Sequence, residues 1–202
     1  SPLLENTQKQ ARALETALRA HGDYDVFVCM RYWHPLTEAV VAELKQRGYT
    51  NVILLPLYPQ YSHTTTGSSV NEFKRACVRQ NYHPRAQLVR EWYGHADYQQ
   101  AIVESIRAEA RKLPDPDPAH IELLFSAHGL PQKVVDAGDP YERHIHATYE
   151  AVRRTLGWPR TTLSPRSTST RSITPGAALP ICTIWCGWIM QSSVVAAGAA
   201  AA

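Results

Sequence analysis

The order of apolar and polar residues along the first 158 positions alternates between two periods. Short continuous apolar runs predict strands buried on both faces, and apolar residues repeated every three or four positions predict helices. The predicted strands are residues 26–30, 52–57, 86–89 and 121–125. The predicted helices are residues 3–20, 35–47, 68–79, 98–113 and 141–156. This alternation predicts an α/β fold of doubly wound parallel sheets, covered by helices on both faces.

One proline-rich segment interrupts the alternation. Residues 114–118 read Pro-Asp-Pro-Asp-Pro. Three prolines in five residues can neither continue a helix nor enter a central strand. The sequence therefore predicts a domain boundary here, with residues 1–113 forming one domain and residues 119–158 the first βα unit of a second.

Charged residues stop almost completely at one point of the chain. All 18 Asp and Glu residues and every Lys precede position 160, and from position 160 onward only Arg160, Arg166 and Arg171 are charged. The stretch 160–202 shows no sustained helical or strand period. We interpret it as an out-of-frame product or a disordered tail, and we expect it to pack against nothing.

Composition excludes several classes of protein. The net charge of +3 is spread along the chain without a basic tract, which argues against a nucleic-acid partner. No run approaches the ~20 apolar residues that cross a bilayer, and no signal peptide is visible. Four cysteines do not make a disulfide framework, so we expect a reducing cytoplasm. Peripheral membrane association and the oligomeric state stay open.

The strongest candidate for chemistry is a histidine just beyond a predicted strand. The strand 121–125 is followed by two small residues and then by His128. Catalytic groups in open α/β sheets gather beyond the carboxyl ends of the strands. An imidazole with a pKa of ~6.5 is mostly neutral at pH 7 and can accept a proton or ligate a metal ion. A single loop histidine is more often an ordinary surface residue, so position alone leaves both interpretations open.

Five stretches of the chain are together similar to motifs of one family. They are SPLLENTQKQA (1–11), MRYWHPLTEAV (30–40), LPLYPQYSHTTTGSSVNEF (55–73), SAHGLP (126–131) and GDPY (138–141). In this order they resemble the ferrochelatases of the bacterial type, protohaem ferro-lyases that insert ferrous iron into a porphyrin in haem biosynthesis. The resemblance implies insertion of iron into protoporphyrin IX or coproporphyrin.

The resemblance covers about residues 1–158. It implies the chelatase fold, two doubly wound domains with the porphyrin between them, both incomplete here. It also implies that the chain begins within the first domain and ends after the first βα unit of the second. We therefore expect an internal fragment that is inactive by itself. Two alternatives to the ferrochelatase function stay open: an inactive truncated product, and a chelatase that inserts cobalt or nickel into another tetrapyrrole.

The resemblance gives His128 the catalytic role. The histidine of the SAHGLP motif is expected either to take up pyrrole protons or to ligate the incoming iron, and the sequence does not decide between base and ligand. Its partner in the family is a glutamate of a later motif that this chain does not contain.

Five further residues are expected to bind the porphyrin. Arg31 follows the strand 26–30, where a guanidinium can form a bidentate pair with a propionate, and the ring of Tyr32 can pack on the macrocycle. The resemblance adds Tyr61, Ser62 and Ser1 to the substrate site. The hydroxyl-rich loop around Ser62 precedes a helix, so N-capping of that helix explains it equally well.

No permanently bound cofactor is expected, and ferrous iron is a substrate. In the animal enzymes the position of His63 is a cysteine that helps to hold an iron–sulfur cluster. Histidine stands there in this chain, which argues against a cluster of that kind.

Overall fold

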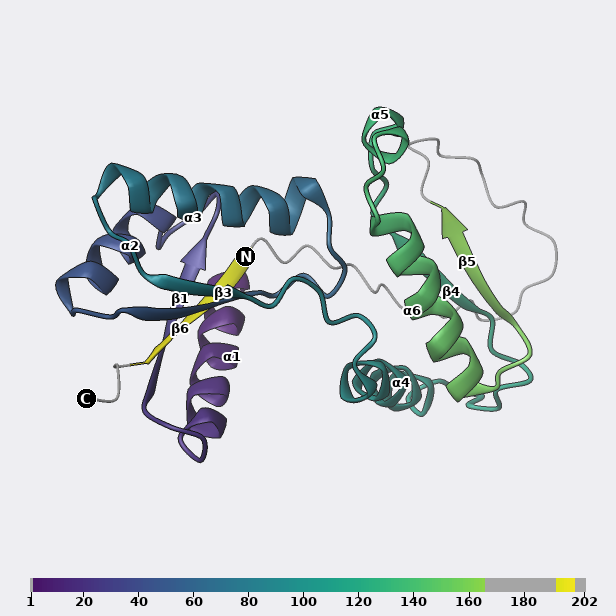
Figure 1. The fold of residues 1–202 in the computed structure, drawn as a ribbon. Helices are drawn as coiled ribbons and strands as arrows, with labels where there is room; N and C mark the ends of the chain where they lie inside the picture. The colour runs from purple at the N-terminus through teal and green to yellow at the C-terminus, as the bar shows by residue number, and fades with distance from the viewer. Residues whose placement is uncertain (1, 166–191, 199–202) are drawn as a thin grey trace. The chain divides into compact units, whose positions relative to one another are not determined.

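The computed structural model describes residues 2–165 and 192–198. These residues form two compact units, coloured purple to teal and teal to green in Figure 1, with the yellow strand β6 belonging to the first. Unit 1 comprises the chain up to Glu91 together with β6 (Ser192–Gly198) from near the C-terminus. Unit 2 begins at Trp92 and lies between these two segments in the sequence.

Unit 1 is a four-stranded sheet with helices on both faces (Figure 1). Its strands β1, β2 and β3 are Tyr24–Met30, Asn51–Pro56 and Arg85–Leu88. Its helices α1, α2 and α3 are Leu3–Leu18, Thr37–Gln46 and Ser68–Arg79, and a π-helical turn, His63–Gly67, leads into α3. The strand order is β1-β6-β2-β3. Strand β6 is antiparallel to both β1 and β2, and β2 is parallel to β3. Strands β1, β2 and β3 therefore all run in one direction.

The two faces of this sheet are buried to different degrees. The chain moves one way across the sheet from β1 to β3, so right-handed crossovers place α2 and α3 on the same face, and α1 covers the other. Alternate residues of β2 are fully buried against α2 and α3, and the residues between them are half-buried. The predicted burial on both faces therefore holds only at the end of β1, where the consecutive residues Cys29 and Met30 are both buried, and β3 is exposed along its length. The core members are Phe27, Cys29, Val40, Val41, Leu44, Val52, Leu54, Phe73 and Cys77.

Unit 2 is a smaller α/β layer. Its strands β4 (Leu123–Ala127) and β5 (Thr161–Pro165) pair in parallel. Its helices α4, α5 and α6 are Ala96–Ala110, Gln132–Asp136 and Tyr141–Leu156. A buried cluster joins α4, β4 and α6, with Ile102, Ile106, Leu123, Phe125, Val152 and Leu156 as members. None of the helices in the described ranges is long and apolar enough to cross a membrane.

The structure divides the chain earlier than the prolines at 114–118 suggested. Helix α4 precedes these prolines and still belongs to unit 2, because Ile102 and Ile106 pack against Val152 and Leu156 of α6. The prolines interrupt regular structure inside unit 2. The boundary between the two units, each with its own core, lies between Glu91 and Trp92.

The structure also differs from the expectation that residues 160–202 pack against nothing. Thr161–Pro165 forms β5 beside β4, and Ser192–Gly198 forms β6 between β1 and β2. Ala197 is fully buried in the core of unit 1. Residues 166–191 and 199–202 lie outside the described part, and the out-of-frame origin of this stretch stays a prediction.

Candidate active site

The predicted substrate-binding residues of unit 1 gather at the carboxyl edge of its sheet. Because β1, β2 and β3 run in one direction, the segments that follow them meet at the same edge. Arg31 and Tyr32 directly follow β1, and Tyr61 and Ser62 lie in the loop after β2. Ser1 lies outside the described residues.

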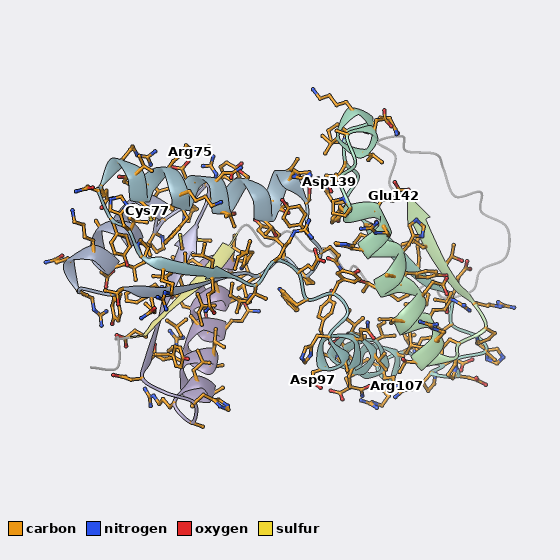
Figure 2. The ribbon with its side chains drawn as sticks, in the orientation of Figure 1. Arg75, Cys77, Asp97, Arg107, Asp139 and Glu142 are labelled. Carbon is orange, nitrogen blue, oxygen red and sulfur yellow. The ribbon has the colours of Figure 1, made fainter. Side chains whose placement is uncertain are left out.

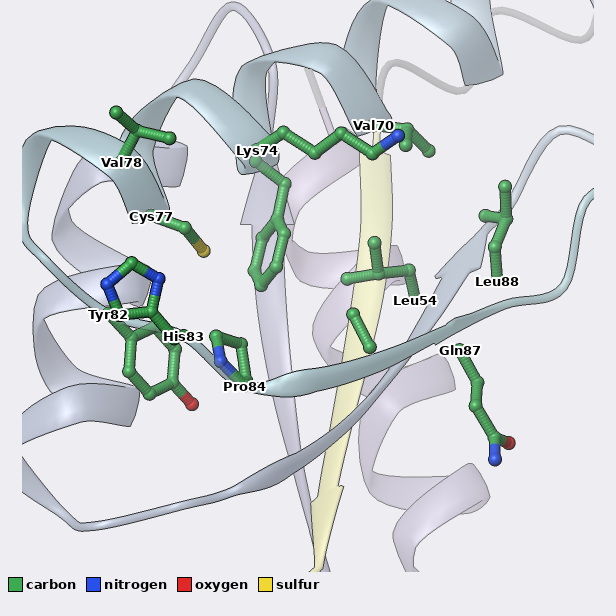
Figure 3. Close-up of a pocket in the computed structure, with 12 residues that line it drawn as sticks. Leu54, Val70, Lys74, Cys77, Val78, Tyr82, His83, Pro84, Gln87 and Leu88 are labelled. Carbon is green, nitrogen blue, oxygen red and sulfur yellow. The ribbon is translucent and has the colours of Figure 1, made fainter.

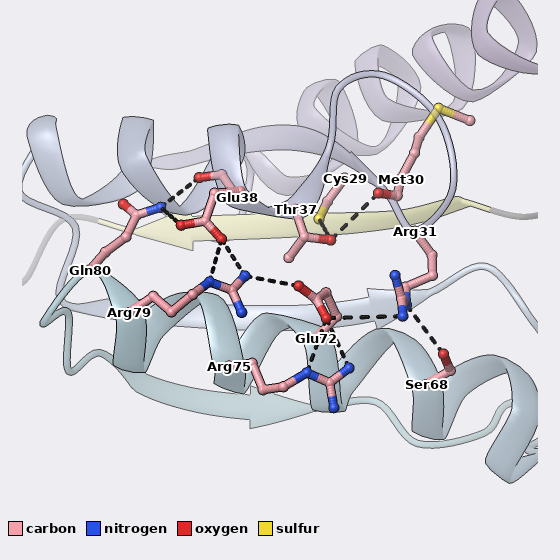
Figure 4. A network of polar contacts seen from close by, with 10 residues as sticks. All are labelled: Cys29, Met30, Arg31, Thr37, Glu38, Ser68, Glu72, Arg75, Arg79 and Gln80. Atoms are coloured by element: carbon pink, nitrogen blue, oxygen red, sulfur yellow. Dashed lines mark hydrogen bonds and ion pairs between the residues drawn. The ribbon is translucent and has the colours of Figure 1, made fainter.

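The guanidinium of Arg31 is held by helix α3 (Figure 4). Its Nε donates to Oγ of Ser68 at 3.2 Å, and its Nη2 lies 3.9 Å from Oε2 of Glu72. Its Cζ lies 4.7 Å from the ring centroid of Tyr32, so cation and ring stack at the end of β1. The Arg31 side chain is 24% exposed, which leaves part of it open to a ligand.

The ring of Tyr32 projects into solvent. Its exposed fraction is 58%, and the neighbouring Trp33 is 63% exposed. The Tyr32 hydroxyl lies 3.4 Å from Oγ of Ser68. Burial, with a smaller contribution from Tyr32, raises the pKa of Tyr58 to about 12, so this phenol stays protonated at neutral pH. An exposed aromatic ring stacked on a guanidinium forms a surface suited to a flat, anionic ligand.

Glu72 balances the positive charge at this edge. Its carboxylate accepts hydrogen bonds from Nη2 of Arg75 at 2.8 Å and from Nη2 of Arg79 at 2.9 Å, in addition to facing Arg31 (Figure 4). The hydrogen bond from Arg79, followed by that from Arg75, lowers the pKa of Glu72 below its usual value. Arg79 also binds Glu38 on α2, so the network ties α2 and α3 to the end of β1.

The loop after β2 is fixed by capping hydrogen bonds. Ser62 is fully buried, and its Oγ accepts from the N–H of Thr64 at 3.1 Å at the start of the π-helical turn. Ser62 therefore caps the π-helical turn, whereas α3 itself follows Gly67 and has no side-chain cap. The contact of Ser62 with substrate stays a prediction. A Cβ at Gly67 would lie 3.1 Å from the Tyr61 hydroxyl, so this glycine lets the turn close against Tyr61.

Arg90 is a candidate that the sequence analysis missed. Its Cζ lies 3.9 Å from the ring centroid of Tyr61, and the Tyr61 hydroxyl in turn contacts Nδ1 of His63 at 3.2 Å. Arg90 lies two residues beyond the end of β3, whereas Arg31 directly follows β1, and the same reasoning from the carboxyl end of a strand identifies both. The edge therefore carries a guanidinium stacked on a tyrosine after each of two strands.

His128 occupies the corresponding position in unit 2. It directly follows the last residue of β4 and is exposed. The sequence placed the end of this strand two residues earlier, so the structure brings His128 closer to the sheet than expected. No hydrogen bond to its imidazole is found among the described residues.

The GDPY motif supports the loop that carries His128. Gly138 has a φ of 87°, and Oδ1 of the buried Asp139 accepts from the N–H of Tyr141 at 3.0 Å, where α6 begins (Figure 2). Burial raises the pKa of the Tyr141 phenol, and a hydrogen bond from the main chain of His128 partly opposes this rise. The second quoted motif of this unit thus contacts the first through one tyrosine.

A separate cavity of about 460 Å³ lies in unit 1 between α3 and β3 (Figure 3). Its walls are mainly apolar, from Leu54, Val70, Phe73, Val78 and Leu88, with Lys74 and His83 among the polar members. None of the predicted site residues lines it. Across the described residues, no group of three His, Cys, Asp or Glu side chains is arranged to hold a metal ion.

Comparison with known proteins identifies the family. The family model described as Ferrochelatase matches residues 1–172, which extends beyond residue 158, where the resemblance of the motifs ended. Among curated proteins, the ferrochelatase of Parasynechococcus marenigrum is 43% identical over 162 residues, covering 77% of this chain and 40% of the relative. That of Synechocystis sp. is 43% identical over 166 residues, covering 79% of this chain and 42% of the relative.

A ferrochelatase from a third organism is similar to this chain to the same degree. The protein from Geotalea daltonii is 42% identical over 158 residues, covering 78% of this chain and 48% of its own length. The chain thus spans less than half of the length of these three relatives. Its matched part contains all the quoted motifs, and on this similarity the chain belongs to the ferrochelatase family.

Proposed function

We propose that this chain serves the insertion of ferrous iron into protoporphyrin IX or coproporphyrin, with unit 1 binding the porphyrin and His128 acting on the pyrrole protons or on the iron, and that the 202 residues do not complete the reaction by themselves. The observation that carries this proposal is the family match over residues 1–172, which includes the histidine motif. The geometry supports it, because each candidate residue of the described part follows the carboxyl end of a strand.

The roles follow from the chemistry of metal insertion. Two pyrrole N–H protons leave while the iron loses its water ligands, and an exposed neutral imidazole can assist either step. Porphyrin propionates need cations, which Arg31 and Arg90 supply, and the macrocycle needs flat apolar contacts, which Tyr32 and Tyr61 supply. Ser62 acts in this proposal through the shape of the loop that carries Tyr61.

A titration of the 202-residue chain with protoporphyrin IX, followed by absorbance, tests the binding half of the proposal. We expect saturable binding that weakens in Arg31→Ala. The insertion half is tested by replacing the matching part of the Synechocystis sp. relative with residues 1–158 of this chain and measuring zinc insertion. A chimera that binds porphyrin and prefers cobalt or nickel to ferrous iron would support the alternative chelatase function instead.

A further inference from the structure

The hydroxyl of Ser68 lies where two candidate residues meet. Ser68 is the first residue of α3 and directly follows the turn that leads from Ser62. Its Oγ lies 3.2 Å from Nε of Arg31 and 3.4 Å from the hydroxyl of Tyr32 (Figure 4). One short side chain therefore contacts both predicted substrate-binding residues that follow β1.

The hydrogen-bonding capacity of a serine hydroxyl suits this position. It has one proton to donate and two lone pairs to accept, whereas a guanidinium only donates. Oγ of Ser68 must therefore accept from Nε of Arg31. It retains its own proton and a second lone pair, so it can bond the Tyr32 hydroxyl in either direction.

Helix α3 occupies one edge of the planar guanidinium and leaves another open. Nε and Nη2 lie on the same edge, where Nε meets Ser68 and Nη2 faces Glu72 one turn further along the helix. Within residues 2–165 and 192–198, no other acceptor is found for Arg31. The outer edge, which Nη1 and Nη2 share, can bind a carboxylate through two parallel hydrogen bonds.

We propose that Ser68 is a positioning residue that, together with Glu72, fixes the Arg31 guanidinium so that its outer edge is presented to a carboxylate of the substrate. This inference rests on the proposed function, which assigns a porphyrin propionate to Arg31. A long arginine side chain loses much rotamer freedom when it binds a ligand, and a side chain that is already held loses less. Ser68 thus increases affinity without contacting the substrate.

Hydrogen exchange at Arg31 tests the positioning in the ligand-free chain. The Nε–H of Arg31 is followed by NMR in the 202-residue protein and in Ser68→Ala, Ser68→Thr and Ser69→Ala. We expect faster exchange in Ser68→Ala alone, because threonine keeps the hydroxyl and Ser69 makes a matched control in the same turn. Unchanged exchange in Ser68→Ala overturns the proposal, whatever the protein binds.

Binding of protoporphyrin IX and of its dimethyl ester tests the consequence. We expect Ser68→Ala to weaken binding of the free acid by about three- to tenfold, the size of one hydrogen bond, and to leave binding of the ester unchanged. Ser68→Thr should bind the free acid as tightly as wild type. In the Arg31→Ala background, Ser68→Ala should cause no further loss of affinity for the acid. A wild-type preference for the acid that persists in Ser68→Ala overturns the positioning role alone. No preference in the wild type overturns the role of Arg31 and this inference with it.

Discussion

In unit 1 the side chains of Arg31 and Tyr32 meet on one serine hydroxyl, whereas in unit 2 His128 is exposed and no hydrogen bond to its imidazole is found among the described residues. A side chain that binds a fixed carboxylate gains from being held in advance. A side chain that takes up and releases a proton or an aqueous metal ion needs access to solvent. The held arginine and the exposed imidazole therefore match the two halves of the proposed reaction.

The largest expected effect is on the rate of metal insertion when the exposed His128 is replaced. His128→Ala, in the chimera with the Synechocystis sp. relative, should slow zinc insertion by about 10²–10⁴-fold, the usual contribution of one proton-transfer group. Porphyrin affinity should stay within a factor of two, about 0.4 kcal/mol, because the proposed binding contacts lie in unit 1. Steady-state zinc insertion and an absorbance titration measure the two quantities. Near-normal turnover in the variant would remove His128 from the mechanism.

A second prediction asks whether the two units are also separate in stability. Leu44 of unit 1 and Ile106 of unit 2 are both fully buried, so each truncation to alanine should cost about 2–5 kcal/mol. Each should destabilise its own unit only, because the two clusters share no residue. Native-state amide exchange, read separately for the two units, measures this. Val78→Ala, at a position that is 74% exposed, is the control, and equal loss of protection in both units would show one cooperative core.

A third prediction concerns the start of α6. Asp139→Ala removes the buried carboxylate that accepts from the N–H of Tyr141 at the start of α6. Loss of one such bond, worth about 1 kcal/mol, should speed amide exchange at Tyr141 by roughly fivefold. Exchange in β4 itself should not change. If the Tyr141 amide exchanges at the wild-type rate in Asp139→Ala, the start of α6 is held by something other than this carboxylate.

The smallest effect is on the pH dependence of unit 1. The pKa of Glu72 is lowered in the folded protein, chiefly by Arg79, so its contribution to stability is present above the unfolded pKa and is lost as pH falls through the folded value. We expect wild type to lose more stability than Glu72→Gln as the pH is lowered from 6 to about 3. Because the partner side chains Arg75 and Arg79 are about half exposed, the difference should stay below about 1 kcal/mol. Urea denaturation at several pH values measures it, and parallel pH profiles would contradict the assignment.

Local signals in the sequence predicted most elements of the fold. Helices α3 and α6 begin and end at the predicted residues, since each is an amphipathic stripe with a clear stop, as at Gly157, which has a φ of 68°. Strands β5 and β6 were not predicted, because Thr161–Pro165 and Ser192–Gly198 carry no strong pattern and their pairing depends on distant partners.

The proline-rich segment shows a second limit of local signals. Three prolines end a helix wherever they occur, and they say nothing about which core that helix joins. Helix α4 joins the core of unit 2 through the contacts of Ile102 and Ile106 with α6. The boundary between cores was therefore a matter of tertiary packing, which the sequence pattern near residues 114–118 did not reveal.

The candidate site was predictable where position along a strand decides it. Arg31 and His128 each follow a strand, and this alone placed them at a carboxyl edge. Arg90 carries the same signal and was overlooked. The role of Ser68 could not be predicted, because a serine that begins a helix is expected to cap it, and its contacts with Arg31 and Tyr32 exist only in the folded unit.

The position of β6 has a consequence for the time at which unit 1 can become complete. Tyr24 pairs with Gly198, and the same strand pairs Asn51 with Gly198, so β1 and β2 receive their shared neighbour from residues made after all of unit 2. During synthesis, β6 cannot pair with the facing edges of β1 and β2 until the ribosome has translated α4 to β5. Contacts this distant in sequence also form slowly. For most of its synthesis a nascent chain of this protein therefore has two strand edges without their final partner, and unpaired edges are the kind of surface that chaperones protect.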